Sequence, residues 1–414
     1  MMQANINNVD SFGNASIDEL LSVNDLTYLA DNESNVVVER SQKITYSQKT
    51  SYNQNEVIIL QLNTGSDFVS WLDSSLRILV TPTQVVGNAK EITWGGGSVL
   101  NLFKTIRLIS RSGVVITEIT KLNLWNYFNL KMSHSNEWRT NQQGKKLLGV
   151  GVPLDANITN EYVIPLRDLC PFFSDDVLSP SVINAGLRIE ITMDGIAEMF
   201  QHGAANVDLV TNCNVSGIEL NLDSYRLSAG AMSALNSMAA SSGLVLTFPD
   251  LNNSKFAKNA GSTNFSCEVR QAVSMANYVY ASIRTTANVS LTTADSFATI
   301  APTDASTYQY RIASIYLPQT AVRGSKQYYS QLSYAQGDMK SGSELGITDA
   351  EADQNALACA TIARYSTKGS GMALNNSTSL NFNATVDTVQ SDVDVFLMHT
   401  KRVVAFLESI VISE

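Results

Sequence analysis

The sequence has little charge and few of the residues that usually build catalytic or metal sites. Only 16% of its 414 residues are charged, against a usual share of about 25%. It contains three histidines and four cysteines. A polar but weakly charged surface suits close contact with neighbouring molecules, because few ions must lose their water when an interface forms.

The cysteines show no spacing typical of a metal site or a redox pair. They are far apart in the sequence, at Cys170, Cys213, Cys267 and Cys359. The first residues, MMQANINNVDSF, contain no apolar core of a secretory signal. We therefore expect free thiols in a reducing compartment.

The histidines are also isolated. His134, His202 and His399 lie near no Cys or carboxylate at metal-ligand spacing, and His399, on or beside a predicted strand, is expected to be structural. The sequence contains no G-x-S-x-G elbow. We predict no catalytic, cofactor-binding or metal-binding residues, so neither an enzyme nor a cofactor is expected.

Basic segments are short and scattered. The net charge is −10, and the first 39 residues carry seven acidic side chains and no Lys or Arg. Nucleic-acid binders usually present a basic face, so we expect no sequence-specific contact with a genome. Lys145-Lys146 and Lys401-Arg402 are interpreted as solvated surface or as ion-pair partners.

The sequence contains two pairs of neighbouring acidic residues that could be taken for a site. Asp175-Asp176 follows Phe172-Phe173 and is read as a solvated loop, with calcium binding as the weaker alternative. Asp392 and Asp394 alternate with valines, which predicts both carboxylates on the wet face of a strand. A glycosidase pair would need a cleft, and the sequence indicates none.

Two segments could be mistaken for functional motifs. Gly95–Gly97 lacks the Lys-Ser/Thr of a phosphate loop and leads into a strand, so it predicts a flexible turn. Leu227–Pro249 is uncharged and long enough to span a bilayer, but its serines, Asn236 and Pro249 oppose insertion. We predict a linker helix there instead, with Met232, Leu235, Met238 and Ala239 on one face and Gly243 as its cap.

The clearest local pattern covers residues 102–133. Leu102–Ser110 and Val114–Ile119 are two apolar runs around the turn Arg111-Ser112-Gly113, which predicts a hairpin. Apolar residues then recur at helical spacing, at Leu122, Trp125, Phe128 and Met132, which predicts an amphipathic helix. This is a packing unit without obvious chemistry.

Elsewhere the chain shows many short strands and few long helices, which is typical of antiparallel sandwiches. Its length suits two domains of about 200 residues. We expect strands to end at Pro82, Pro249 and Pro318 and a polar loop at 136–151. The predicted strands are residues 36–38, 44–46, 56–62, 75–81, 161–165, 186–193, 215–222, 244–248, 263–269, 278–284, 296–300, 308–317, 357–365, 379–385, 392–399 and 403–412.

The two halves show an approximate repeat. Each has a strand, a turn with an Arg-Ser-Gly or Arg-Gly-Ser triplet (at Arg111 and Arg323), and an aromatic helix, with an offset of roughly 200 residues. In the second helix Tyr328, Leu332 and Ala335 share a face. Identity between the halves is low, so the pattern indicates a similar arrangement only.

Five stretches together carry a resemblance to a known family. They are LFKTIRLISRSGVVIT (Leu102–Thr117), Tyr162–Met193, NFSCEVRQAVSMANYVYASIR (Asn264–Arg284), Tyr310–Gly337 and the final segment from Ser379. In this order along the chain, which leaves out the N-terminal arm, they resemble the double jelly-roll major capsid proteins of Polinton-like viruses, virophages and related eukaryotic DNA viruses.

The resemblance implies an all-β fold of two tandem antiparallel eight-stranded jelly rolls, with short helices in the connecting loops. The expected organisation is an acidic arm (1–30), a first jelly roll (31–226), a linker helix (227–243) and a second jelly roll (244–414). The implied function is that of a major capsid protein. Its homotrimers would be pseudo-hexameric capsomers that tile an icosahedral shell in the virion, assembled inside the infected host cell.

The implied partners are neighbouring capsomers, a single jelly-roll penton protein and minor or cement proteins. We also expect no transmembrane segment. Three alternatives remain: a β-sandwich receptor- or glycan-binding virion component, a minor capsid paralogue, and an enzyme on a jelly-roll scaffold. The first requires exposed aromatics in a concave site, and the last requires a cluster of His and carboxylate groups.

Overall fold

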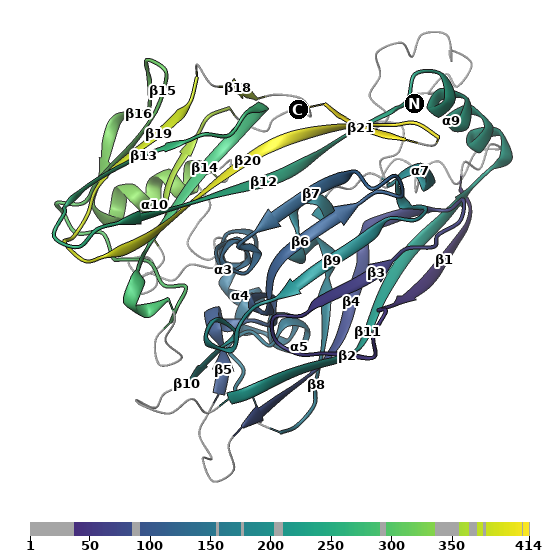
Figure 1. Ribbon diagram of the computed structural model, residues 1–414, viewed down its shortest axis with the longest axis horizontal. Coiled ribbons are helices and arrows are strands. Elements are labelled where there is room, and N and C mark those ends of the chain that lie inside the picture. Colours follow the sequence, from purple (N-terminus) through teal and green to yellow (C-terminus); the bar gives the residue numbers. More distant parts are fainter. Residues whose placement is uncertain are drawn as a thin grey trace.

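The computed structural model in Figure 1 describes most of the chain. The acidic arm and Asp175-Asp176 lie outside the described residues. The described ranges are 37–84, 92–154, 157–174, 178–202, 210–289, 295–335, 356–363, 371–375, 378–407 and 409–413.

The first half of the chain forms an antiparallel sandwich. Its two sheets have the strand orders β1-β11-β4-β8 and β3-β9-β6-β7, and β2 (Ser51–Tyr52) adds to β11. The eight strands of the two sheets are β1 (Val37–Tyr46), β3 (Val57–Gln61), β4 (Phe68–Gln84), β6 (Phe103–Ile109), β7 (Val115–Thr120), β8 (Asn160–Pro165), β9 (Arg188–Met193) and β11 (Val210–Leu227).

The second half forms another such sandwich. Its sheets have the orders β12-β20-β14-β17 and β13-β19-β15-β16, and β18 (Met372–Leu374) and β21 (Ile410–Ser413) add to the first of them. The eight strands are β12 (Leu244–Lys258), β13 (Asn264–Val269), β14 (Val273–Thr285), β15 (Thr307–Ile312), β16 (Ile315–Arg323), β17 (Ala358–Thr361), β19 (Leu380–Thr385) and β20 (Ser391–Ala405).

The two sandwiches use the same topology. Numbered by position in its own sandwich, each strand of the first has a counterpart at the same place in the second, both along the chain and across the sheets. All pairings are antiparallel. The prediction of an all-β double jelly roll is therefore confirmed. A short ribbon, β5 (Ile92–Trp94) with β10 (Phe200–His202), closes one end of the first sandwich.

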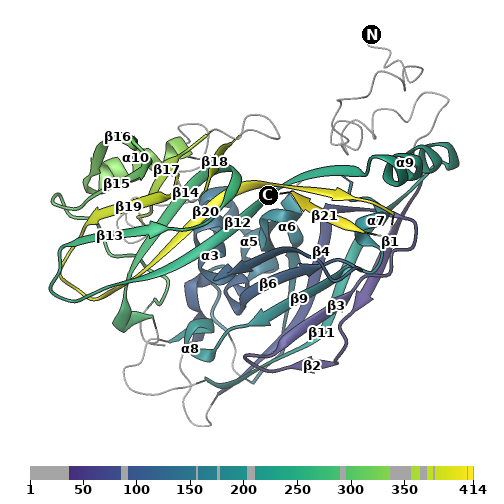
Figure 2. The same ribbon diagram turned by 45° about the horizontal axis from the view of Figure 1, so that its top comes forward.

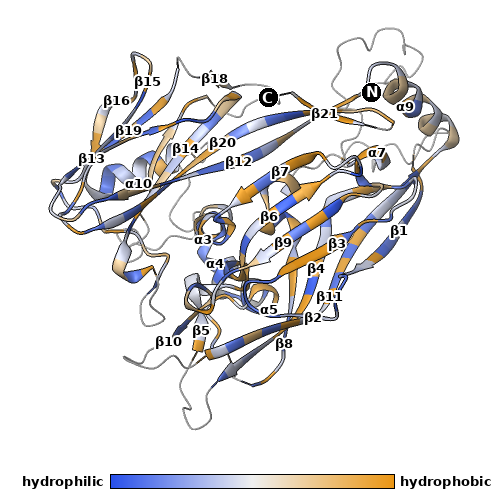
Figure 3. Cartoon of the chain, in the orientation of Figure 1, coloured by the Kyte–Doolittle hydropathy of each residue, from blue (hydrophilic) through white to orange (hydrophobic). Residues whose placement is uncertain are grey.

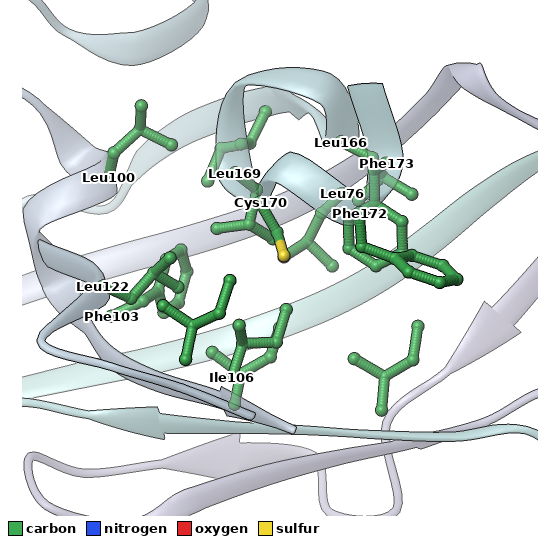
Figure 4. Close-up of a cluster of buried hydrophobic side chains, with 14 of the residues drawn as sticks. Leu76, Leu100, Phe103, Ile106, Leu122, Leu166, Leu169, Cys170, Phe172 and Phe173 are labelled. Atoms are coloured by element: carbon green, nitrogen blue, oxygen red, sulfur yellow. The ribbon is translucent and has the colours of Figure 1, made fainter. Parts of the chain in front are cut away.

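Alternation explains how the strands pack. Along β3, Ile58 and Leu60 are buried while Val57 and Gln61 are exposed, so one strand face meets the core. Figure 3 shows the same alternation of hydrophobic and hydrophilic residues on the neighbouring strands. Buried side chains from β4, β6 and the segments after β8 meet between the sheets, including Leu76, Phe103, Ile106 and Phe173 (Figure 4).

The predicted strand ends at prolines are wrong. Pro82, Pro249 and Pro318 lie inside β4, β12 and β16. Proline cannot donate to a ladder, but it is tolerated where no partner needs its N–H. Strands β12 and β16 are at sheet edges in the main strand order, and β4 extends past its last pair with β8, Val80 with Asn160.

The predicted strand 308–317 is two strands. β15 and β16 form a hairpin whose turn places Ala313 at φ +50°, just as Arg111-Ser112-Gly113 joins β6 to β7 with Gly113 at φ +84°. Arg323-Gly324-Ser325 instead begins a helix. The two triplets are therefore not equivalent, and the true repeat is a strand followed by a helix.

Two long helices follow equivalent strands. α3 (Leu122–Ser133) follows β7 and α10 (Gly324–Ala335) follows β16. A third, α9 (Ala229–Ser241), forms in the segment predicted to be helical, and Gly243 at φ +77° ends it. Of its predicted face, Leu235 and Ala239 are buried but Met238 is exposed.

Short helices occupy segments predicted to be irregular. Residues 136–151 contain two helices rather than a polar loop, because Ser135 and Asn141 cap their first turns. Residues 296–300 form no strand. The short helices are α4 (Asn136–Thr140), α5 (Gln142–Leu148), α6 (Leu166–Leu169), α7 (Ser181–Asn184) and α8 (Ile196–Met199), with 3-10 turns at Gly95–Gly97, Val99–Leu102, Pro171–Ser174 and Thr286–Asn288.

The two sandwiches lie side by side (Figure 2). One hydrophobic cluster continues from Trp125 in α3 to Tyr280 and Phe396 in the second sandwich. A separate cluster fills the interior of the second sandwich. No helix in the described part of the chain is long and apolar enough to cross a lipid bilayer.

Candidate functional site

The contact between the two sandwiches combines buried aromatic and buried polar side chains. We call it the seam and define it as α3 and β7 of the first sandwich against β12, β14 and β20 of the second. Helix α3 begins after Lys121, whose left-handed backbone (φ +56°) turns the chain from β7 into the helix. It lies next to the second sandwich in both Figure 1 and Figure 2.

Helix α3 is buried on all sides. The prediction of an amphipathic helix is therefore wrong, because the face turned away from the first sandwich is covered by the second. Ten of its twelve residues are buried, namely Leu122, Asn123, Leu124, Trp125, Asn126, Tyr127, Phe128, Leu130, Lys131 and Met132.

Aromatic side chains join the two sandwiches. Trp125 meets Tyr280 of β14 and Phe396 of β20, with ring centroids 5.5 and 5.7 Å apart. Tyr127 stacks on Phe297 at 5.6 Å. Such pairs add about 0.5–1.5 kcal/mol each to the effect of burial, so the seam resists relative motion of the two sandwiches.

A polar contact accompanies them where β7 meets β12. The Thr117 hydroxyl donates a hydrogen bond to the Asp250 carboxylate, and both side chains are buried. Lys401 lies 3.3 Å from the same carboxylate, and His399 lies 3.9 Å from it. Asp250 thus connects both sandwiches in one buried network, and His399 has the structural setting that was predicted for it.

Asp392 and Asp394 of β20 are buried, although the alternation predicts that they lie on a solvent-exposed strand face. Asp394 is fully buried and lies 2.7 Å from the buried Arg284 guanidinium, which also donates to the Ser296 carbonyl. Asp392 is 7% exposed and lies 2.8 Å from Lys255. Alternation correctly predicted one shared face, but that face belongs to the sheet that the seam covers.

His134 has a partner that is distant in the sequence, so residue spacing did not predict it. Its Nε2 lies 2.9 Å from the Asp168 carboxylate, and its ring stacks on Trp138 at 3.6 Å. The side chain of His202 lies outside what the structure describes. Among the described residues, no three His, Cys, Asp or Glu side chains converge as a metal site would require.

The cysteines are free thiols, as expected. Burial raises the pKa of Cys213, Cys267 and Cys359 to about 12 and raises that of Cys170 as well. A thiol with so high a pKa forms little of the reactive thiolate at neutral pH.

The triple glycine is a tightly packed turn, so the expected flexible turn needs correction. A Cβ on Gly95 would come within 2.3 Å of the Glu198 carbonyl oxygen, and Gly96 has φ +66°. Only glycine allows such a close approach of two backbone segments. The glycines therefore allow close packing of the backbone, and no α-helix begins there that could bind a phosphate at its N-terminus.

A cavity of about 550 Å³ lies along the seam. Trp125 and Tyr280, which line it, are almost fully buried. Among the described residues, the most exposed aromatic side chains lie elsewhere, on strand and helix surfaces, at Tyr46, Tyr316 and Tyr334. The cavity's lining includes Leu72, Trp125, His134, Asp168, Tyr280 and Met398.

Comparison with known proteins supports the fold. No family model and no curated protein sequence matches the chain. Among solved structures, the quasi-atomic model of the PBCV-1 virus capsid is similar at 9% identity, with a TM-score of 0.64 over 94% of this chain and 99% of that one. The chain has the double jelly-roll fold.

Two further structures are similar over nearly their whole lengths. The Faustovirus major capsid protein has a TM-score of 0.60 at 9% identity, covering 91% of this chain and 92% of its own. A chain of the Sputnik virophage structure has a TM-score of 0.54 at 11% identity, covering 93% and 91%. The likeness therefore includes both sandwiches.

Proposed function

We propose that this chain is the major capsid protein of an icosahedral DNA virus. Its homotrimers form pseudo-hexameric capsomers that tile the faces of the shell. The role is structural and without catalysis. The observation that carries the proposal is the buried seam, since it joins two sandwiches of identical topology into one block. Three such blocks supply six similar sandwiches, as a pseudo-hexagonal ring requires.

The proposed organisation has four parts. The first jelly roll extends over residues 31–226, the helical linker over 227–243, and the second jelly roll over 244–414. The acidic segment 1–30 acts as an arm that ties neighbouring trimers together or binds a minor protein. The other partners are neighbouring capsomers, a single jelly-roll penton protein at the vertices and cement proteins, all within the virion.

The first test is the native mass of the purified chain by light scattering, with electron micrographs of the same sample. We expect a stable trimer with a hexagonal outline. A monomer that does not assemble even with the vertex protein contradicts the proposal. It would favour a receptor- or glycan-binding role, which a glycan array can then examine.

The arm is tested separately by deleting residues 1–30. The trimer should persist, and shells should be fewer or malformed in micrographs. Normal shells from the truncated chain would remove the arm from the assembly mechanism while leaving the capsomer proposal intact.

A further inference from the structure

The cavity along the seam has walls from both sandwiches. Helices α3 and α6 of the first sandwich line it together with β12, β14 and β20 of the second. Its volume of about 550 Å³ lies within the range of about 300–1,000 Å³ that is usual for sites of small organic molecules. A molecule bound there contacts both sandwiches at once.

One part of the cavity wall is aromatic and apolar. Trp125 and Tyr280 meet edge to face with their ring centroids 5.5 Å apart, and each is 2% exposed. Met398 of β20 lies on the same wall and is only partly buried. Aromatic rings and thioethers pack favourably against another ring, so this part of the cavity suits the aromatic body of a ligand.

The charged part of the lining consists of two consecutive residues of α6. Asp168 is 6% exposed, whereas the Arg167 side chain is exposed. The Asp168 Oδ1 atom lies 2.9 Å from Nε2 of His134, but Asp168 Oδ2 has no hydrogen-bond partner within the described residues. In the same part of the chain, Arg167 forms no ion pair with Asp168 or any other residue.

The polar atoms around the cavity therefore lack partners of opposite kinds. A buried carboxylate with an unpartnered oxygen costs free energy, which a donor on a ligand can offset. Trp125 Nε1 is a buried donor that also has no partner among the described residues. The lining thus leaves one acceptor, at Asp168, and donors at Trp125 and Arg167. A ligand that complements it carries both a cationic donor and an anionic acceptor.

We propose that the cavity binds a free aromatic α-amino acid in its zwitterionic form. Its ammonium group donates to Asp168, whose Oδ2 turns toward the cavity, and its carboxylate accepts from Arg167. Its ring packs against Trp125 and Tyr280. A zwitterion leaves neither charge of the lining without a partner, whereas an amine alone or an acid alone leaves one of them unpaired.

The site lies within one chain, so it goes beyond the proposed capsomer and does not depend on it. A ligand that binds only the folded chain, with both walls in place, stabilises that state. Binding should therefore raise the unfolding temperature of the chain. For so small a ligand we expect a Kd of about 1 mM.

The test compares three probes that share one ring. They are L-phenylalanine, phenethylamine, which lacks the carboxylate, and 3-phenylpropionate, which lacks the amine. Each is titrated into the full chain by ligand-observed NMR, and thermal unfolding is recorded with and without the probe. The variants are Asp168→Asn, which keeps an oxygen for His134, and Arg167→Gln. Asp304→Asn and Arg111→Gln, at exposed residues outside the cavity lining, are the matched controls.

We expect saturable binding of L-phenylalanine by the unaltered chain and weaker binding of the other two probes. Asp168→Asn should weaken L-phenylalanine and phenethylamine by about tenfold or more, since it removes a hydrogen bond between charged groups. Arg167→Gln should weaken L-phenylalanine and 3-phenylpropionate by about twofold to fivefold, because an exposed charge contributes less. Each variant should leave the third probe unchanged, and the controls should leave all three unchanged.

Other outcomes overturn the proposal in distinguishable ways. Absence of saturable binding of L-phenylalanine to the unaltered chain rejects the site. Phenethylamine that binds as tightly as L-phenylalanine rejects the amino acid as the ligand class. Equal losses for all three probes in Asp168→Asn show that this residue shapes the cavity and does not contact the amine. The comparison of probes on the unaltered chain needs no variant, so a variant that fails to fold does not prevent the test.

The outcome for this site is separate from that of the proposed function. A chain that binds L-phenylalanine but remains monomeric in light scattering refutes the capsomer and keeps the site. A trimeric chain that binds none of the probes does the reverse.

Discussion

Helices α3 and α10 occupy equivalent places and have different surroundings. Both have twelve residues, follow equivalent strands and are entered through a left-handed residue, Lys121 or Gly324. Ten residues are buried in α3 and five in α10. The topology therefore places a helix at the same edge of each sandwich, and the neighbour decides how much of it is covered.

The sheet faces differ in the same way. In the covered face the Arg284–Asp394 pair has side chains only 4% and 0% exposed. On the outer face of β1 and β11, Arg40 donates to the buried Asp223 carboxylate at 3.1 Å, but the Arg40 side chain itself is 63% exposed. Both members of the first pair are sealed from water, whereas only the carboxylate of the second is, although each pair links neighbouring strands of an equivalent sheet.

The largest expected effect comes from removing the aromatic anchor of the seam. Trp125→Ala should lower the free energy of unfolding by about 3–5 kcal/mol, since it deletes a buried ring and leaves a cavity. Tyr334→Ala in the exposed part of α10 should cost about 0.5 kcal/mol or less. Chemical denaturation of the two variants measures the difference, and equal losses would contradict the contrast between the helices.

The next effect concerns the two ion pairs. Arg284→Met should cost about 3–5 kcal/mol because it leaves Asp394 charged and buried without its partner. Arg40→Met should cost less, about 1–3 kcal/mol, because Tyr225 still donates a hydrogen bond to the buried Asp223 carboxylate and the Arg40 side chain already faces water. Urea titrations compare them, and the double variant Arg284→Met/Asp394→Leu should recover much of the loss. If Arg284→Met alone were harmless, the pair would not be sealed by the seam.

A smaller effect is expected from the hydrogen bond between the sandwiches. Thr117→Val keeps the shape of the side chain but removes the donor to Asp250, which should cost about 1.5–3 kcal/mol for a bond to a charged group. Thr320→Val on the exposed part of β16 is the matched control and should be nearly neutral. Indistinguishable unfolding midpoints for the two would argue against a role of Thr117 in the seam.

The smallest expected effect is on the stability of the fold at low pH. Burial disfavours the Asp392 carboxylate, but the hydrogen bond and charge of Lys255 outweigh it and lower the pKa of Asp392. Its contribution is present above the unfolded-state pKa of about 3.9 and is lost as the pH falls through the lower folded value. Asp392→Asn should therefore flatten the decline of the unfolding temperature below about pH 4.

Glu198 in the first sandwich should show the opposite dependence of stability on pH. Burial and the nearby Asp194 raise the pKa of Glu198, so its contribution is present below its ordinary pKa and is lost as the pH rises through the folded value. Glu198→Gln should flatten a decline of the unfolding temperature on the high side of about pH 4.3. A shared sign for the two variants would contradict the assigned causes.

Local pattern predicted much of the fold. The hairpin and helix of residues 102–133, the helix ended by Gly243 and most strands follow from periodicity and turn residues within short windows. The predicted breaks at Pro82, Pro249 and Pro318 failed because a proline is excluded only where a partner strand needs its N–H. That depends on where each strand lies in the sheet, which a short window does not contain.

The contacts in the seam could not be predicted from short sequence windows for the same reason. Thr117 and Asp250 are 133 residues apart, and Arg284 and Asp394 are 110 apart. Nothing near Asp394 in the sequence indicates a buried cation, and a strand's alternation does not say which face is covered. Likewise, β1 does not reveal that Ile44 and Tyr46 share an exposed face until its register with β11 is known.

The sequence by itself determined the fold class, the order of the elements and the absence of any recognisable catalytic motif, because these depend on composition and on spacings within about ten residues. Only the tertiary structure decided which equivalent surfaces are covered. Burial is a property of pairs of surfaces that distant segments bring together. In this chain it distinguishes two sandwiches of one topology, with ten residues buried in α3 and five in α10.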